Sequence, residues 1–142
     1  MRIYSKSFDK VTEKEERCIN LLTLPDSLFR LDVLRTSKDK SDFQFFLAKE
    51  AGIVVGWVVA FPSEHSIEHS YSAWSPVPAM RVYLYVRDSV RRQGIGKKLL
   101  KKSVKWVEDQ ECGAKVYGWD TRSRGFFNFC KESKYKMEIC RQ

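Results

Sequence analysis

The feature of this chain that most constrains its fold is a glycine-rich turn placed between an apolar run and a helical pattern. The apolar run is Val82–Val86, and the turn that follows it contains Gly94 and Gly96. The first N–H groups of a helix have no partner inside the helix, and the helix dipole adds positive potential at that end. Two glycines let backbone amides approach an anion without collisions with a Cβ atom. The sequence therefore predicts a phosphate-binding site at a strand–turn–helix junction.

The spacing of the two glycines excludes two familiar phosphate loops. A P-loop has four residues between its glycines, whereas only Ile95 separates Gly94 from Gly96. The dinucleotide-binding fingerprint has a third glycine at the position where this chain has Leu99. A Gly-x-Gly pair by itself is also compatible with a tightly packed helix start that binds nothing.

The residues around the turn favour a specific ligand. Arg91, Gly94 and Gly96 form the pattern Arg-x-x-Gly-x-Gly, after a strand pattern and before an amphipathic helix pattern. This arrangement resembles the coenzyme A site of the GNAT N-acetyltransferase superfamily. The resemblance implies that the turn holds the pyrophosphate of acetyl-coenzyme A through Arg91, Arg92, Gln93, Gly94, Ile95, Gly96 and Lys97.

The resemblance also implies roles for residues on either side of the turn. In this superfamily the central sheet splays apart between its fourth and fifth strands, and the cofactor arm enters the gap. The backbone of Leu84, Tyr85 and Val86 would then hydrogen-bond the pantetheine arm, and an N–H near Val86 would polarise the thioester carbonyl. Ser123 stands where the family often has an asparagine that contacts the cofactor.

The order of patterns along the chain indicates one mixed α/β domain covering residues 1–142. The patterns predict strands at Met1–Phe8, Phe43–Lys49, Ile53–Phe61, Met80–Val86, Ala114–Trp119 and Lys136–Cys140. They predict helices at Glu13–Leu24, Asp26–Leu34, Gly94–Glu108 and Arg124–Ser133. This order resembles the GNAT fold, which implies a mixed sheet of about six strands, splayed between the fourth and fifth and flanked by about four helices.

Two local patterns refine this prediction. Thr12 is followed three residues later by Glu15, which is typical of a capping box at the start of a helix. The segment Pro62–Ala79 contains three prolines and several serines, and we expect it to be a long loop that borders the acceptor site.

The catalytic acid is predicted from the family pattern. Acetyl transfer to an amine requires loss of a proton from the ammonium group and protonation of the leaving thiolate. The usual acid in the family is a tyrosine in a C-terminal pattern like Phe-Tyr-x-x-x-Gly-Phe, and Cys130 stands at the tyrosine position. A thiol with a reference pKa of about 8.5 can donate a proton. The alternatives are that Cys130 is a buried, inert cysteine or that Tyr117 or Tyr135 reaches the site instead.

The catalytic base is left open by the sequence. Some histone-modifying members have a glutamate six residues before the position of Val86, where this chain has Met80. The segment Pro62–Ala79 offers other titratable groups, namely Glu64, His65, Glu68 and His69. The two histidines have a spacing that suits a metal site on a helix, but the prolines and serines oppose a helix and no third ligand is evident. We therefore expect no metal.

The positive charge of the chain is concentrated at the turn and the helix that follows it. The formal net charge is +8, and the window from Ser89 to Val107 contains seven basic residues and no acid. This charge could attract the anionic cofactor. Part of it could form a solvated face, or the segment Lys97–Lys105 could bind nucleic acid such as a charged transfer RNA.

The rest of the composition sets the expected cellular context. The four cysteines are widely spaced and form no Cys-x-x-Cys pair, so we expect reduced thiols and a cytoplasmic protein. No apolar run approaches the length of a membrane span. The chain stops soon after Cys140, so a final strand could come from a second subunit and a homodimer stays open.

The predicted function is an acetyl-coenzyme-A-dependent N-acetyltransferase that acts on a primary amine of a protein or a small molecule. One alternative is a module that binds the cofactor with little or no catalysis. The other is a member directed to nucleic acid. The sequence leaves the acceptor open, because acceptor loops vary on a shared scaffold.

Overall fold

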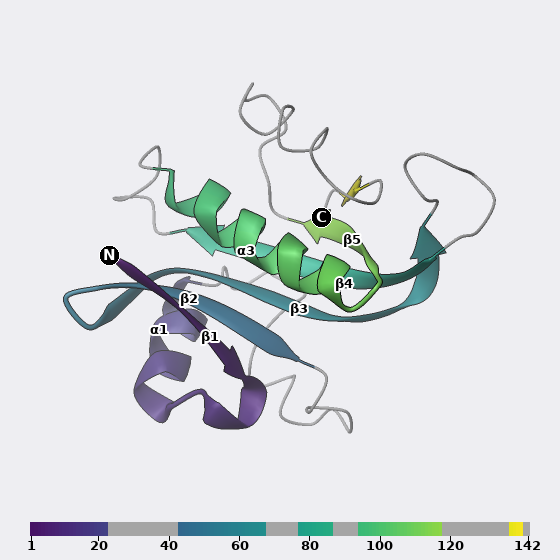
Figure 1. Ribbon diagram of the computed structural model, residues 1–142. Helices are drawn as coiled ribbons and strands as arrows, with labels where there is room; N and C mark the ends of the chain where they lie inside the picture. The colour runs from purple at the N-terminus through teal and green to yellow at the C-terminus, as the bar shows by residue number, and fades with distance from the viewer. Residues whose placement is uncertain (23–42, 68–76, 87–93, 118–136, 141–142) are drawn as a thin grey trace.

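A six-stranded mixed sheet forms the centre of the protein. The computed structural model describes residues 1–22, 43–67, 77–86, 94–117 and 137–140 (Figure 1). The strands lie in the order β1-β2-β3-β4-β5-β6. Their bounds are β1 Arg2–Ser7, β2 Gln44–Glu50, β3 Ile53–Ile67, β4 Val77–Val86, β5 Gly113–Tyr117 and β6 Glu138–Cys140. Pairing is antiparallel from β1 to β4 and parallel from β4 to β6, so the predicted mixed sheet is confirmed.

The helices of the described residues lie on opposite faces of this sheet (Figure 1). They are the short 3-10 helix η1 at Phe8–Lys10, α1 at Glu13–Leu22 and α3 at Ile95–Asp109. Within the described ranges, no helix is long and apolar enough to cross a lipid bilayer. The predicted helices at Asp26–Leu34 and Arg124–Ser133 lie outside the described residues.

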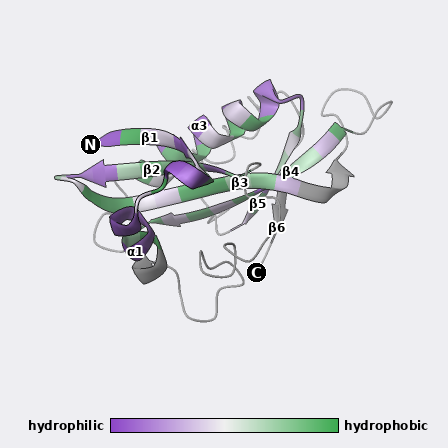
Figure 2. Ribbon diagram, turned by 90° about the horizontal axis from the view of Figure 1, so that it is seen from below, coloured by the Kyte–Doolittle hydropathy of each residue, from purple (hydrophilic) through white to green (hydrophobic). Residues whose placement is uncertain are grey.

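Each face of the sheet has its own apolar core. Successive residues of a strand point to opposite faces, so Val82 and Leu84 of β4 pack toward α3 while Tyr83 packs on the other side. The predicted apolar stripe of α3 is buried in the first core and consists of Ile95, Leu99, Leu100, Val104 and Val107. Figure 2 shows hydrophobic residues along β2 and β3 and hydrophilic residues on α1.

The prediction of a long loop over Pro62–Ala79 is wrong at both ends. Strand β3 continues to Ile67 and β4 already begins at Val77, and only residues 68–76 lie outside the described part of this segment. Pairing between the two strands shifts register between Pro62 and Ser66. Proline cannot donate to a sheet ladder and is tolerated at such irregularities. Pro62 and Pro78 therefore lie beside an irregular part of the ladder between β3 and β4.

The start of α1 is held to the sheet by a buried carboxylate. The predicted capping box is confirmed, because the Glu15 amide donates to Thr12 Oγ1 at 3.2 Å and the Thr12 amide donates to Glu15 Oε1 at 2.9 Å. Glu15 also accepts hydrogen bonds from Lys6 Nζ of β1 at 2.8–2.9 Å and forms an ion pair with Lys49 of β2. Burial opposes ionisation, but the hydrogen bonds from Lys49 and Lys6 outweigh it and lower the pKa of Glu15 to about 2.

Candidate anion-binding site at the start of α3

The start of α3 presents backbone N–H donors that no side chain in the described part of the chain caps. Gly94 is the N-cap residue, and its φ of 77° and ψ of 7° lie in the left-handed region that favours glycine. Among the described residues, no side chain makes a capping hydrogen bond there, and the first turn of α3 contains no acidic residue. The Lys98 amide donates to Gly94 O at 3.1 Å, which is the first hydrogen bond of the helical ladder. The amides of Ile95, Gly96 and Lys97 come before that bond and point out of the helix end.

Among the described residues, none crowds the Cα atom of Gly94. A Cβ atom built on Gly94 would meet no atom within 4 Å. Gly94 is exposed, Gly96 is half-buried, and the side chains of Lys97 and Lys98 are exposed. No described residue packs over Gly94, and the alternative of a helix start that binds nothing stays open. Open amides, a positive helix end and two flanking ammonium groups form a site that fits a diphosphate.

Gly56 fixes the position of this helix start, and the sequence analysis did not identify it. Gly56 lies on β3 opposite Val86, the last residue of β4. A Cβ atom on Gly56 would lie 3.1 Å from Leu99 Cδ1, 3.3 Å from the Tyr85 carbonyl oxygen and 3.5 Å from Ile95 Cγ2. The missing Cβ lets the first two turns of α3 close against the sheet. A glycine inside an apolar strand is a known sign of such close approach, and it was the available signal.

The end of β4 can offer only its backbone to a ligand on the β5 side. The side chains of Leu84 and Val86 pack into the core under α3, and the Tyr85 ring stacks on Trp57 with centroids 5.0 Å apart. The ladder between β4 and β5 runs from Ala79–Gly113 to Tyr83–Tyr117, and β4 then continues beside β3 as far as Val86. Residues 118–136, which follow β5, lie outside the described part of the chain, so the opening between the fourth and fifth strands stays a prediction.

A band of aromatic rings crosses the sheet on the face that α1 covers. The Tyr83 and Tyr117 rings are stacked at 4.5 Å, and Tyr83 also stacks on Phe61 at 5.7 Å. Phe61 in turn stacks on Phe43 at 4.8 Å. Tyr117, one of the alternative acids, is thus part of a packed band. Met80, at the position where some relatives have a glutamate, is buried in the other core.

Several predicted site residues lie outside the described part of the chain. They are the cofactor candidates Arg91, Arg92, Gln93 and Ser123, the acid candidates Cys130 and Tyr135, and the loop residues Glu68 and His69. Glu64 and His65 fall on β3 instead of a loop. Among the described residues, no group of three His, Cys, Asp or Glu side chains is placed to hold a metal ion.

Comparison with known proteins connects this arrangement to one family. The model of the acetyltransferase (GNAT) family matches residues 9–130. Among curated proteins, no sequence match was found.

Solved structures show the same fold at low sequence identity. The aminoglycoside acetyltransferase meta-AAC0020, from an uncultured soil metagenomic sample and in complex with trehalose, is 20% identical, with a TM-score of 0.56 over 94% of this chain and 86% of that chain. A glucosamine-6-phosphate N-acetyltransferase from Arabidopsis thaliana is 14% identical, with a TM-score of 0.58 over 99% of this chain and 97% of that chain. A structure described as a transcriptional regulator from Bacillus halodurans C-125 is 13% identical, with a TM-score of 0.60 over 92% and 91% of the two chains.

Proposed function

This chain belongs to the acetyltransferase (GNAT) family, and we propose that it transfers the acetyl group of acetyl-coenzyme A to a primary amine. The observation that carries the proposal is the exposed start of α3, which follows the central strand β4 in the chain and has no capping side chain among the described residues. Phosphate oxygens are favoured at such a helix end by both hydrogen bonding and the helix dipole.

The described residues at the helix start would hold the pyrophosphate. The amides of Ile95, Gly96 and Lys97 would donate to its oxygens, and Gly94 would leave room for it. The arginines at 91 and 92 precede the helix in sequence, and a guanidinium can bind phosphate with two parallel hydrogen bonds. The backbone of Leu84, Tyr85 and Val86 would hold the pantetheine arm, with Ser123 as a further contact.

The chemistry requires little from side chains. Acetyl-coenzyme A supplies an acetyl group activated as a thioester. The neutral amine forms a bond to the carbonyl carbon as the carbon–sulfur bond breaks, the amine nitrogen loses a proton and the thiolate gains one. A backbone N–H near Val86 would stabilise negative charge on the carbonyl oxygen. Cys130, at the family's tyrosine position, is our candidate donor of the proton to the thiolate.

Membership of the family does not determine which kind of molecule bears the acceptor amine. The similar structures include proteins described as acetyltransferases for aminoglycosides, for glucosamine-6-phosphate and for ribosomal-protein alanine. We therefore propose that the acceptor has a primary amine, and we leave the kind of molecule that bears this amine to experiment.

The test is thiol release from acetyl-coenzyme A in the presence of an amine panel. The panel would contain an aminoglycoside, a polyamine, an amino sugar phosphate and peptides with a free N-terminus or lysine. We expect one class to accelerate release and to gain the mass of one acetyl group. Binding of acetyl-coenzyme A without acceleration by any amine would favour the non-catalytic module. Absence of binding at millimolar cofactor would show that the proposal is wrong.

A further inference from the structure

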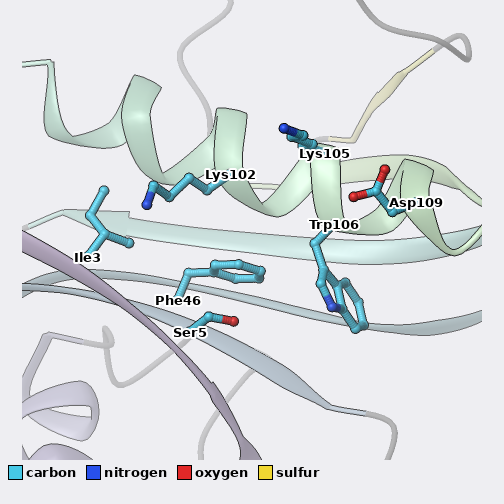
Figure 3. A pocket seen from close by; sticks show the side chains of 7 residues that line it. All are labelled: Ile3, Ser5, Phe46, Lys102, Lys105, Trp106 and Asp109. Carbon is cyan, nitrogen blue, oxygen red and sulfur yellow. The ribbon is translucent and has the colours of Figure 1, made fainter.

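A hollow lies on α3 beyond the cofactor site, between the last turns of the helix and strands β1 and β2 (Figure 3). It has a volume of about 320 Å³. Its apolar side is formed by Ile3, Phe46 and Trp106, and its polar rim by Ser5, Lys102, Lys105 and Asp109. Lys102 is seven residues after Ile95, or about 10 Å along the axis, so the hollow is separate from the helix start.

The polar rim of the hollow favours an anionic oxygen. Ser5 Oγ accepts a hydrogen bond from Gln44 Nε2 at 2.6 Å, so its own O–H can donate to another group. Lys102 and Lys105 also line the hollow, and both side chains are exposed. Two cations and a hydroxyl donor match the oxygens of one phosphate group.

The apolar side of the hollow favours a flat ring. Phe46 is buried and meets Trp106 edge to face, with ring centroids 6.3 Å apart and an angle of 68° between the planes. Trp106 is half-buried, so part of the indole lines the hollow. A base that stacks on an aromatic side chain gains affinity regardless of its sequence, because every base has a π face. Asp109, at the far end of the rim, can accept a hydrogen bond from an exocyclic amino group.

A row of lysines extends this site along the helix. Lys98, Lys102 and Lys105 are spaced by four and three residues, which places them in one row on the exposed face of α3. The steps between them are about 6 Å and about 4.5 Å along the axis. Because no acid interrupts the helix from Ile95 to Val107, the row gives a continuous line of positive charge that ends at Trp106.

We propose that the hollow binds one nucleotide of a single-stranded nucleic acid, with its base against Trp106 and its phosphate on Lys102, Lys105 and Ser5. The neighbouring phosphate of the strand lies toward Lys98. Binding at this second site requires neither acetyl-coenzyme A nor acetyl transfer. The proposal can therefore be right or wrong independently of the proposed reaction.

The test measures binding of a fluorescein-labelled 12-nucleotide single-stranded RNA by anisotropy over a range of salt concentrations. Two phosphates held by lysines predict a slope of log K against log salt of about −1.4 for a single strand. The double variant Lys102→Glu/Lys105→Glu should weaken binding at least about tenfold at 0.1 M salt and make the slope less negative by about 0.7. Trp106→Leu should weaken it by about tenfold through lost stacking, while Trp106→Phe should retain most of the affinity.

Matched controls separate this site from charge alone and from the cofactor site. Lys10→Glu/Lys14→Glu makes the same charge change at exposed positions of η1 and α1, and it should leave RNA affinity within about twofold. Equal losses of RNA affinity in the two double variants would overturn the proposal. It would also be overturned if the wild type bound a poly-glutamate peptide as tightly as the RNA, which would indicate an acidic protein partner.

Displacement of the RNA by acetyl-coenzyme A would also overturn the proposal, because the hollow would then belong to the cofactor site. If mononucleotides bound as tightly as the 12-mer, the hollow would be a site for a free nucleotide, and the proposal of a single-stranded nucleic acid would be wrong. Circular dichroism verifies that each variant is folded.

Discussion

Gly56 of β3 and Leu99 of α3 meet at a point where one added carbon atom would force a shift. A Cβ atom on Gly56 would lie 3.1 Å from Leu99 Cδ1, and the neighbouring Tyr85 carbonyl oxygen would be 3.3 Å away. The Leu99 side chain is fully buried, so it has little space in which to withdraw. Gly56 therefore determines how closely the start of α3 approaches the end of β4, and with it the position of the open amides.

Replacement of Gly56 by alanine should reduce both stability and cofactor affinity. Overpacking at this contact should lower the free energy of unfolding by about 1–3 kcal/mol, measured by urea denaturation. Acetyl-coenzyme A should bind more weakly because the helix start is displaced. The double variant Gly56→Ala/Leu99→Val removes the opposing Cδ atoms and should recover part of both losses. Unchanged stability and affinity in Gly56→Ala would contradict the positioning role.

Glu15 should make the protein sensitive to acid. The pKa of Glu15 falls from an ordinary value of 4.5 to about 2 in the folded state. This shift corresponds to a contribution to the free energy of unfolding on the order of 3 kcal/mol. Because the folded pKa is depressed, this contribution is present above pH 4.5 and is lost as the pH falls toward 2. Glu15→Gln should therefore destabilise the protein at pH 7, and the gap to the wild type should narrow below pH 4.5.

A matched control for Glu15 is available on the same helix. Glu13 is exposed, and its contact with Arg17 measures 4.0 Å at the surface. Glu13→Gln should change the free energy of unfolding by less than about 0.5 kcal/mol at any of these pH values. If Glu13→Gln and Glu15→Gln changed the free energy of unfolding equally, burial and the contacts with Lys6 and Lys49 would not account for the contribution of Glu15.

Tyr117 should support packing rather than proton transfer. Its ring stacks on the ring of Tyr83, its partner in the parallel ladder of β4 and β5, with centroids 4.5 Å apart. Tyr117→Phe keeps the ring and should change kcat by less than about threefold, whereas removal of a positioned acid costs 10²–10⁴-fold. Tyr117→Leu should lower stability by about 0.5–1.5 kcal/mol beyond the loss of buried area. A large fall in kcat with unchanged stability in Tyr117→Phe would instead identify Tyr117 as the acid.

Periodicity and local chemistry predicted most of the framework. The capping box at Thr12 and Glu15 could be identified because its partners are three residues apart. The apolar stripe of α3 was equally clear, because a helix that covers a sheet on one side must repeat its apolar residues at helical spacing. The strand–turn–helix junction at Gly94 followed from the glycines and the apolar run before them.

Features that depend on contacts across the fold were missed or predicted wrongly. The loop expected over Pro62–Ala79 is strand at both of its ends, because long-range pairing of β3 with β4 overrides the local tendency of proline and serine to form turns. Gly56 gave only a weak signal, since its role depends on Leu99, which is 43 positions later in the chain. The assignments of Arg91, Arg92, Gln93, Ser123 and Cys130, and the cytoplasmic setting, stay predictions.

The most direct test of the central claim is calorimetric titration of acetyl-coenzyme A into the wild type, Gly94→Asn and Gly94→Asp. Both side chains tolerate the left-handed conformation and have nearly the same shape, so the two variants differ by one negative charge at the helix start. If the open amides hold the pyrophosphate, the aspartate variant should bind at least about tenfold more weakly than the asparagine variant. Equal affinity in the two variants would contradict the account, because the phosphates would then lie elsewhere.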